Sequence, residues 1–254
     1  MSHLEGRHAV ITGGASGIGA AVATALADAG GRVTVMGRDP VRLERFLATC
    51  PGARSIICDV TDEGSIGQAF AQARIELGPV DILVNNAGAV ESASFQGTDV
   101  DMLDRMLAVN TRAVLVCTNA VLPAMIEAGW GRIITVASTA GLKGYPYIAA
   151  YAAAKHAAIG LMRALAMEVA AKGVTANAVC PGYTDTEMVS QALDDVTART
   201  GKTREEVLAR YVAGNPQGRL VEPEEVADTV LWLAGDGASA INGQAIAIAG
   251  GEVG

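Results

Sequence analysis

Residues 12–19 read Thr-Gly-Gly-Ala-Ser-Gly-Ile-Gly, and they join a strand-like apolar run, Ala9–Thr12, to a helical pattern. The glycines allow a tight turn whose backbone can approach a pyrophosphate, and the N-terminus of the following helix favours the phosphate charge. The spacing is Gly-x3-Gly-x-Gly instead of the commoner Gly-x-Gly-x-x-Gly, and tight turns also use glycine for steric reasons alone. Its position directly after the first strand predicts a phosphate-binding turn for a dinucleotide.

The rest of the chain alternates short β-branched runs with amphipathic segments. The runs Ile82–Val84 and Ile133–Val136 are continuously apolar, which is typical of strands covered on both faces by crossover helices. The alternation predicts one α/β domain, residues 1–254, with a doubly wound parallel sheet of seven strands and helices on both faces. The strands are expected at Ala9–Thr12, Arg32–Met36, Ser55–Cys58, Ile82–Asn85, Arg132–Ala137, Thr175–Cys180 and Ala245–Ala249.

One region departs from this alternation. Residues 189–218 are charged and helical in pattern, and they lie between the sixth and seventh strands. An insertion at the carboxyl edge of a sheet is where a substrate lid is found, so we expect a lid here.

Composition and charge exclude several classes of protein. The 254 residues are 50% hydrophobic and 18% charged, which excludes a disordered chain. A net charge of −8 argues against nucleic acid or an anionic membrane surface as partner. The most apolar helical stretch, around 148–167, is interrupted by Lys155, His156 and Arg163, so no membrane span is expected.

The cysteines indicate the compartment. There are four, without CxxC spacing and without paired histidines, at positions 50, 58, 117 and 180. They are expected to be free, buried thiols, forming neither a disulfide framework nor a metal site. The N-terminus has no signal-peptide pattern, so we expect a cytoplasmic protein.

The end of the second strand bears on the choice of dinucleotide. NAD sites place an acidic residue there for the ribose hydroxyls, whereas a 2′-phosphate requires arginine. Here Gly37 takes the acidic position and Arg38 follows, with a fork of donors suited to phosphate. Asp39 before Pro40 is better explained as a helix N-cap followed by proline at the first helical position. NADP(H) is favoured, and NAD(H) remains the alternative if Arg38 is only a solvated charge.

Further motifs follow the remaining strands. Together with the glycine turn they resemble the short-chain dehydrogenase/reductase family over essentially the whole chain, and above all its 3-oxoacyl reductases and 3-hydroxyacyl dehydrogenases. The motifs that carry the resemblance are TGGASGIG (12–19), Asp59-Val60, NNAG (85–88), Asn110, Ser138, YAAAK (151–155) and PGYTDT (181–186). The resemblance implies a Rossmann-type fold and a catalytic set of Asn110, Ser138, Tyr151 and Lys155.

Elementary chemistry independently supports Tyr151 and Lys155. They are four residues apart, so they share one face of a helix. A tyrosine acts as a base at neutral pH only if its pKa falls by about three units, which requires roughly 4 kcal/mol of phenolate stabilisation. A lysine ammonium and an oxidised nicotinamide can supply much of this. Taken singly, each of these residues has an ordinary structural explanation.

The family resemblance implies the individual roles. Tyr151 would exchange a proton with the substrate oxygen, Ser138 would polarise the carbonyl, and Lys155 would lower the pKa of Tyr151 and hold the nicotinamide ribose. Asn110 would order a water that passes protons to Lys155. The residues expected at the cofactor are Gly13, Ser16, Gly17, Ile18, Gly19, Arg38, Asp59, Val60, Asn86, Ala87, Gly88, Tyr151, Lys155, Pro181, Gly182, Thr184 and Thr186.

The resemblance predicts an oxidoreductase that interconverts a ketone and a secondary alcohol with NAD(P)(H). Carrier-protein reductases dock an acidic carrier on two basic residues, and this chain has Gly129 and Lys172 at those places. We therefore favour a free or CoA-linked 3-oxoacyl or 3-hydroxyacyl compound, or another small carbonyl. Basic side chains in the lid could contact a CoA phosphate, although such residues more often solvate a helix face: Arg199, Lys202 and Arg204.

Two expectations remain. The alternative function is a non-catalytic NADP-binding sensor or scaffold, which would be expected to lose Tyr151 or Lys155, and both are present. Family members are commonly homotetramers or dimers, and Ala-rich faces at about 100–128 and 149–172 permit such packing here.

Overall fold

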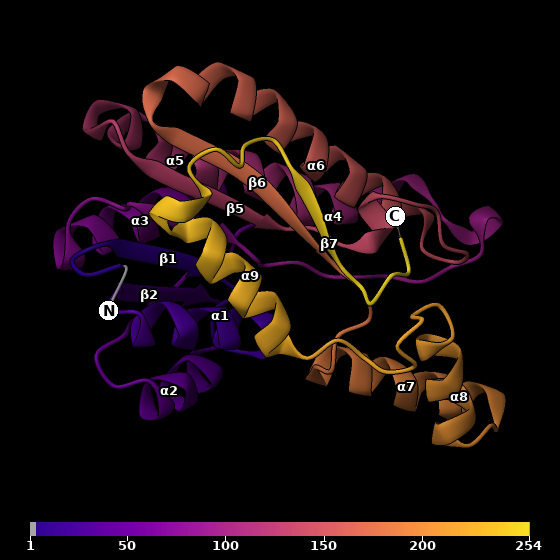
Figure 1. Cartoon of the computed structure of the whole chain (residues 1–254). Helices are drawn as coiled ribbons and strands as arrows, with labels where there is room; N and C mark the ends of the chain where they lie inside the picture. Colours follow the sequence, from indigo (N-terminus) through magenta and orange to yellow (C-terminus); the bar gives the residue numbers. More distant parts are fainter. Residues whose placement is uncertain (1–3, 254) are drawn as a thin grey trace.

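The computed structural model describes residues 4–253, so residues 1–3 and 254 of the predicted domain lie outside the described range. Its centre is a parallel sheet of seven strands in the order β3-β2-β1-β4-β5-β6-β7 (Figure 1). The predicted strands are all present, and their boundaries differ from the prediction by no more than one residue. They are β1 (His8–Thr12), β2 (Arg32–Gly37), β3 (Arg54–Ile57), β4 (Ile82–Asn85), β5 (Gly131–Val136), β6 (Val174–Pro181) and β7 (Ala245–Ile248).

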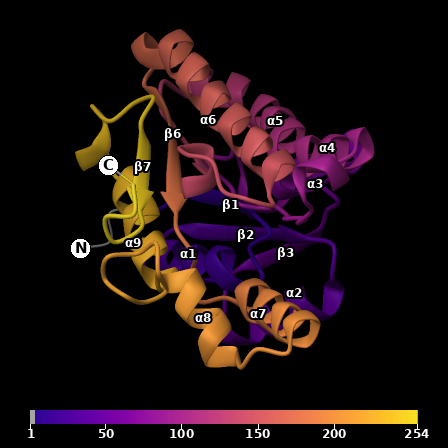
Figure 2. The same cartoon turned by 90° about the vertical axis from the view of Figure 1, so that its right-hand side faces the viewer.

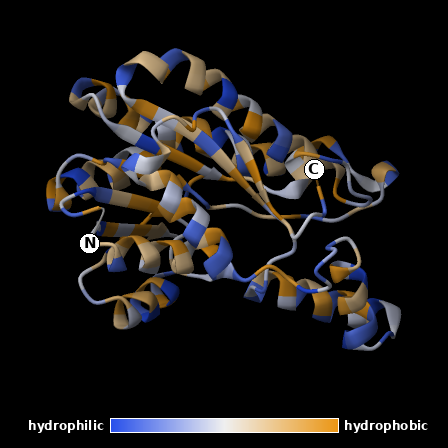
Figure 3. Ribbon diagram, in the orientation of Figure 1, coloured by the Kyte–Doolittle hydropathy of each residue, from blue (hydrophilic) through white to orange (hydrophobic). Residues whose placement is uncertain are grey.

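The strands are continuously apolar because both faces of the sheet are covered. Successive side chains of a strand point to opposite faces, so each central strand contributes to two cores. In β1, Ala9 and Ile11 pack in one core and Val10 packs in the other. In β5, Ile134 and Ile133 are divided in the same way. Figure 3 shows the hydrophobic strands enclosed between helices of mixed hydropathy.

One face is covered by α1 (Gly17–Asp28), α2 (Pro40–Thr49) and α9 (Pro223–Ala234). Their buried residues belong to a single core with the sheet, for example Leu26, Phe46 and Val230. The predicted N-cap of α2 is confirmed, because Asp39 Oδ1 accepts hydrogen bonds from the backbone N–H groups of Val41 at 2.9 Å and Arg42 at 3.3 Å.

The opposite face is covered by α3 (Glu63–Leu77), α5 (Ala113–Ala128) and α6 (Ala149–Val169), while α4 (Val100–Leu107) packs on α6. A π-helical turn, η2 (Ala108–Arg112), joins α4 to α5. The sequence did not predict this turn. Short 3₁₀ turns are η1 (Phe95–Gly97), η3 (Thr139–Gly141), η4 (Ala170–Lys172) and η5 (Asp236–Ala238).

The strand order places the crevice of the fold. The chain leaves β1 towards β2 on one side and reaches β4 on the other, so a crevice opens at the carboxyl ends of β1 and β4. The region expected to be a lid forms α7 (Glu187–Thr200) and α8 (Arg204–Val212). α7 begins two residues before the predicted start of this region. Both helices extend beyond the carboxyl edge, at the lower right of Figure 1 and in the foreground of Figure 2.

The structure bears on the predictions about cysteines, membrane-spanning segments and metal sites. All four cysteines are buried and free, as predicted. Length and composition would let one helical stretch cross a membrane, and it is Val100–Ala128, not the stretch around 148–167 that we judged most apolar. Its buried side chains pack in the cores of this domain. Within residues 4–253, no group of three or more His, Cys, Asp or Glu side chains is placed to hold a metal.

Candidate active site

The glycine turn after β1 is tied to the end of β4 by one threonine. The hydroxyl oxygen of Thr12, which is 2% exposed, accepts hydrogen bonds from the backbone N–H groups of Asn86 at 3.0 Å and Ala87 at 3.1 Å. The Asn86 side-chain amide in turn donates to the carbonyl oxygens of Thr12 at 3.0 Å and Gly13 at 3.1 Å. Asn86 therefore holds the turn in shape, a role that the sequence did not predict.

The glycine turn leaves no space for side chains at Gly13 and Gly19. Gly13 has a φ of +63°, and a methyl group on it would lie 3.0 Å from the Asn86 amide nitrogen. A methyl group on Gly19 would lie 2.2 Å from the Gly13 carbonyl oxygen. Ser16 is the N-cap of α1, and within residues 4–253 its side chain makes no cap hydrogen bond to the first N–H groups of the helix. A bare, positively polarised helix start behind a glycine turn fits a pyrophosphate.

The adenosine side of the crevice carries the predicted arginine. Arg38 follows β2, its side chain is 75% exposed, and its guanidinium lies 3.9 Å from Asp59 Oδ2. Asp59 Oδ1 accepts hydrogen bonds from the Thr61 backbone N–H at 2.9 Å and the Thr61 hydroxyl at 2.7 Å. These bonds, with a smaller contribution from Arg38, lower the pKa of Asp59. Val60 is buried beside it. The exposed fork of Arg38 is free to meet a phosphate.

Ser138 and Tyr151 lie beside each other although different elements carry them. Ser138 follows β5, and its hydroxyl oxygen accepts a hydrogen bond from the Ala140 N–H at 3.1 Å, which begins η3. Tyr151 is in the first turn of α6. Burial raises the pKa of Tyr151 to about 12, and the neighbouring Ser138 hydroxyl opposes that rise. In the protein alone, Tyr151 therefore stays protonated at neutral pH.

Lys155 lies one turn further along α6, and its side chain reaches the end of β5. It is 5% exposed, and its ammonium donates a hydrogen bond to the carbonyl oxygen of Val136 at 2.9 Å. Burial lowers the pKa of Lys155 to about 8. Its nitrogen lies 5.6 Å from the centre of the Tyr151 ring. A lysine that is this easily deprotonated can take part in proton transfer near neutral pH.

Asn110 reaches the same region from the π-helical turn. Its amide nitrogen donates to the carbonyl oxygens of Ala89 at 2.9 Å and Met106 at 3.0 Å. Its Oδ1 atom is buried and has no hydrogen-bond partner within residues 4–253. A methyl group on Gly88 would lie 2.7 Å from this Oδ1 and 3.5 Å from Lys155 Nζ. A buried, unpaired acceptor next to a lysine is a place where a water would be held.

The segment after β6 closes over the glycine turn. Pro181 ends β6 and Gly182 follows, and the Thr184 hydroxyl donates to the Gly182 carbonyl oxygen at 3.0 Å. Thr186 is the N-cap of α7, and a methyl group on Gly17 would lie 3.1 Å from its Cγ2. The predicted cofactor residues of β1, β4 and β6 are thus brought together at one edge. The side chain of Ile18 packs against the core under α1.

The sequence did not predict three tyrosine side chains near the Ser138 loop and the segment after β6. Tyr183 stacks on Tyr211 of α8 with ring centres 4.5 Å apart. Tyr145, in the loop before α6, is hydrogen-bonded to Thr139 at 2.8 Å and to Glu252 near the C-terminus at 2.6 Å. These contacts join distant parts of the chain, and no local sequence motif predicts them.

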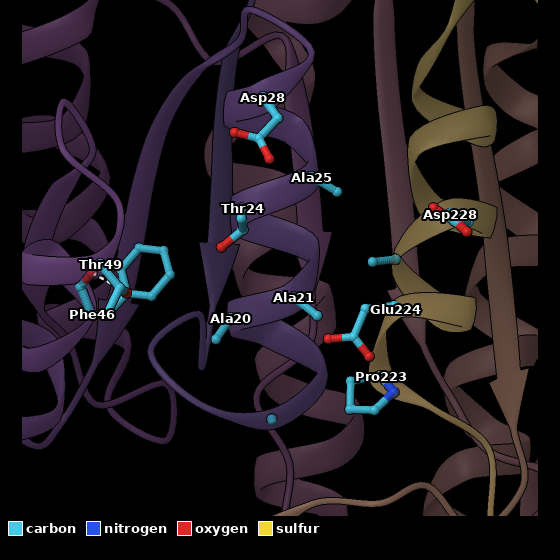
Figure 4. Close-up of a pocket in the computed structure, with 12 residues that line it drawn as sticks. Ala20, Ala21, Thr24, Ala25, Asp28, Phe46, Thr49, Pro223, Glu224 and Asp228 are labelled. Atoms are coloured by element: carbon cyan, nitrogen blue, oxygen red, sulfur yellow. Dashed lines mark hydrogen bonds between the residues drawn. The ribbon is translucent and has the colours of Figure 1, made fainter.

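A separate hollow runs along the outer side of α1, from Gly17 to Asp28. It has a volume of about 400 Å³ and is lined by α1, α2 and α9. Figure 4 shows that alanines and carboxylates line it, among them Asp28, Glu224 and Asp228. None of the four expected catalytic side chains lines this hollow, because all four lie at the carboxyl edge of the sheet.

Comparisons with known proteins agree with this architecture. The family model described as short chain dehydrogenase matches residues 7–197. The D-beta-hydroxybutyrate dehydrogenase of Rhizobium meliloti (strain 1021) is 37% identical over 96% of this chain and 97% of its own. The acetoacetyl-CoA reductase of the same organism is 37% identical over 97% of this chain and 98% of its own.

A solved structure is equally similar. An actinorhodin polyketide ketoreductase variant with NADPH superposes with a TM-score of 0.93 at 36% identity, covering 99% of this chain and 98% of the other. The alternative of a non-catalytic sensor or scaffold has no support, because these relatives are named dehydrogenases and reductases and the chain keeps Tyr151 and Lys155. The chain belongs to the short chain dehydrogenase family and is an oxidoreductase that acts on hydroxyl and keto groups.

Proposed function

We propose that this protein reduces the ketone of a 3-oxoacyl compound, free or linked to coenzyme A, to the secondary alcohol with NADPH. The observation that carries the proposal is the convergence of Ser138, Tyr151 and Lys155 beside a glycine turn that fits a pyrophosphate. The names of the relatives, which include an acetoacetyl-CoA reductase and a ketoreductase with NADPH, support the substrate class.

Tyr151 is the proton donor in this proposal. Its pKa of about 12 keeps the phenol protonated at neutral pH, which is the form that reduction requires. Ser138 uses its oxygen to cap η3, so its hydroxyl hydrogen can point to the carbonyl oxygen of the substrate. The two hydroxyl groups together hold and polarise that oxygen. When bound, the nicotinamide supplies the hydride.

Lys155 and Asn110 restore the proton that Tyr151 gives up. The ammonium of Lys155 uses one donor on Val136, so others remain for the nicotinamide ribose and for a water. Asn110 Oδ1 is the acceptor that would orient that water next to Lys155. The π-helical turn positions Asn110 here, and such turns frequently occur at functional sites.

The preference for NADPH over NADH rests on Arg38. Gly37 replaces the acidic residue that would bind ribose hydroxyls, and the exposed Arg38 guanidinium suits a 2′-phosphate. The Arg38 guanidinium lies 3.9 Å from Asp59, while Ser16 adds no positive charge at the turn.

The remaining expectations belong to the same proposal. Residues 1–254 act as one domain, α7 and α8 form the lid, and the lid residue Arg204 is engaged by Asp194 and Ser190. Arg199 and Lys202 are thus the better candidates for a CoA phosphate. The protein acts in the cytoplasm, as a homotetramer or homodimer.

The test is to follow oxidation of NADPH and NADH in parallel with acetoacetyl-CoA, ethyl acetoacetate and small ketones. We expect turnover with a 3-oxoacyl ester or thioester and a preference for NADPH. Cofactor binding without turnover on any ketone or alcohol would contradict the proposed reaction.

A further inference from the structure

The C-terminal tail places a buried carboxylate beside the catalytic loop. The side chain of Glu252 is 5% exposed, and its Oε1 lies 3.3 Å from the Lys143 ammonium. The same oxygen accepts a hydrogen bond from the Tyr145 hydroxyl at 2.6 Å. Lys143 also donates to the backbone carbonyl oxygen of Glu252 at 3.2 Å. Lys143 is therefore held twice by the same residue.

This cluster borders the site where the substrate must lie. Tyr145 is hydrogen-bonded to Thr139, which directly follows Ser138. A methyl group on Gly182 would lie 3.2 Å from Glu252 Oε2, so the carboxylate also touches the turn before Tyr183. Burial raises the pKa of Tyr183, and the nearby Tyr211 and Glu252 add smaller contributions in the same direction. The carboxylate thus lies on the wall shared by the Ser138 loop and the segment after β6.

The charges of this wall are satisfied within the protein. Lys143 is the cation of the loop between Ser138 and Tyr151, and Glu252 neutralises it. Elsewhere, between α4 and the segment after β4, Arg105 and Glu91 form a two-pronged ion pair at 3.0 and 2.8 Å. An anionic group next to the reacting carbonyl would have to displace Glu252 from Lys143 or remain unpaired near a second carboxylate. Both cost binding free energy, because the Glu252 carboxylate is itself almost completely buried.

We infer that Glu252 makes this site selective for ketones whose neighbouring groups are uncharged, such as esters and thioesters of 3-oxo acids, against the free acids. The inference rests on the proposed function and narrows its substrate class. Glu252 acts as a specificity-determining residue by occupying Lys143, so that an anionic substrate group finds no free cation there. Leaving the charge of a competing ligand unpaired is a common source of specificity.

The experiment compares ethyl acetoacetate with acetoacetate, which share the reacting ketone and differ in charge. With NADPH, we expect kcat/KM for the ester to exceed that for the acid by at least about 100-fold, since the anion would lie unpaired beside the buried Glu252 carboxylate. Glu252→Gln removes the carboxylate charge but keeps an acceptor for Tyr145. It should lower this ratio at least about tenfold, mainly by a lower KM for acetoacetate.

Two further variants make the result specific. Lys143→Met added to Glu252→Gln should restore the discrimination, because the freed cation is then lost. Glu224→Gln on α9 removes the same charge from an exposed, remote position and should leave the ratio unchanged. An unchanged ratio in Glu252→Gln, or equal use of acid and ester by the unmodified protein, would overturn the inference.

A binding measurement covers the case in which the variant does not fold. With NADPH fluorescence as readout, ethyl 3-hydroxybutyrate should bind the unmodified protein at least about 100-fold more tightly than 3-hydroxybutyrate. Equal binding would refute the selectivity. If no ketone is reduced although the ester still binds preferentially, the proposed reaction fails and the selectivity stands.

Discussion

Asn110 and Lys155 approach the same small space, next to Gly88. A methyl group on Gly88 would lie 2.7 Å from Asn110 Oδ1 and 3.5 Å from Lys155 Nζ, so only glycine leaves the space open. The acceptor of Asn110 is buried and unpaired within residues 4–253, which leaves it available to a water. The proton path of the proposed reaction passes through this space.

Gly88→Ala should therefore impair catalysis more than stability. We expect kcat with NADPH to fall on the order of 100-fold, because a small displacement of positioned groups has effects of this size. Gly144→Ala is the matched control, since a methyl group there meets nothing within 4 Å. Equal kcat values for the two variants would contradict a functional water between Asn110 and Lys155.

Arg38→Ala should change cofactor preference. A charged hydrogen bond to a phosphate contributes about 1.5–3 kcal/mol, so the Kd of NADPH should rise roughly 10- to 100-fold while that of NADH changes little. Titration of cofactor fluorescence measures both. Arg45→Ala removes an exposed arginine from α2 and serves as the control. Equal weakening of NADPH and NADH binding by Arg38→Ala would argue that Arg38 is only a solvated charge.

Lys155→Met should abolish activity and alter the pH dependence of stability. Burial lowers the pKa of Lys155 from 10.5 to about 8, so the folded protein releases this proton before the unfolded chain does. The free energy of unfolding should therefore rise between pH 8 and 10.5 in the unmodified protein, relative to the variant, by about 3 kcal/mol. Tyr151, whose pKa is raised, acts in the opposite direction only above pH 10. The free energies of unfolding are measured by urea denaturation at several pH values. If they change with pH in the same way in both proteins, Lys155 is not desolvated in the folded protein.

Thr12→Val should destabilise the glycine turn although it keeps the shape of the side chain. The buried Thr12 hydroxyl accepts hydrogen bonds from two backbone N–H groups, and valine would leave both unpaired. At about 1–3 kcal/mol for each unsatisfied donor, the free energy of unfolding should fall by roughly 2–6 kcal/mol. Thr12→Ser retains the acceptor and should recover most of this loss. Equal stability of the valine variant would mean that water reaches the turn.

The sequence predicted what local motifs and periodicity determine. Each strand follows from an apolar run, and the cap at Asp39 follows from a short local motif, so both are visible without knowledge of the tertiary structure. The clustering of Ser138, Tyr151 and Lys155 was implied by the resemblance to a known family.

Other features depend on hydrogen bonds that leave no periodic signal. The π-helical turn at Ala108–Arg112 has the same apolar pattern as a continuous α-helix. Asn86 was expected at the cofactor floor, and the additional role of its amide, which holds the glycine turn through two carbonyl oxygens, was not predicted. The pairing of Tyr145 with Glu252 spans 107 residues. Only the folded chain brings these groups together.

The most direct test of the account is Tyr151→Phe, which removes one hydroxyl group and keeps the ring. If Tyr151 donates the proton, kcat for ketone reduction should fall by about 10²- to 10⁴-fold, because this is the usual contribution of general acid catalysis. The Kd of NADPH, measured by fluorescence, should stay within about threefold of the unmodified protein, since a change of this size is below about 1 kcal/mol. Undiminished turnover in Tyr151→Phe with NADPH bound normally would contradict the central claim.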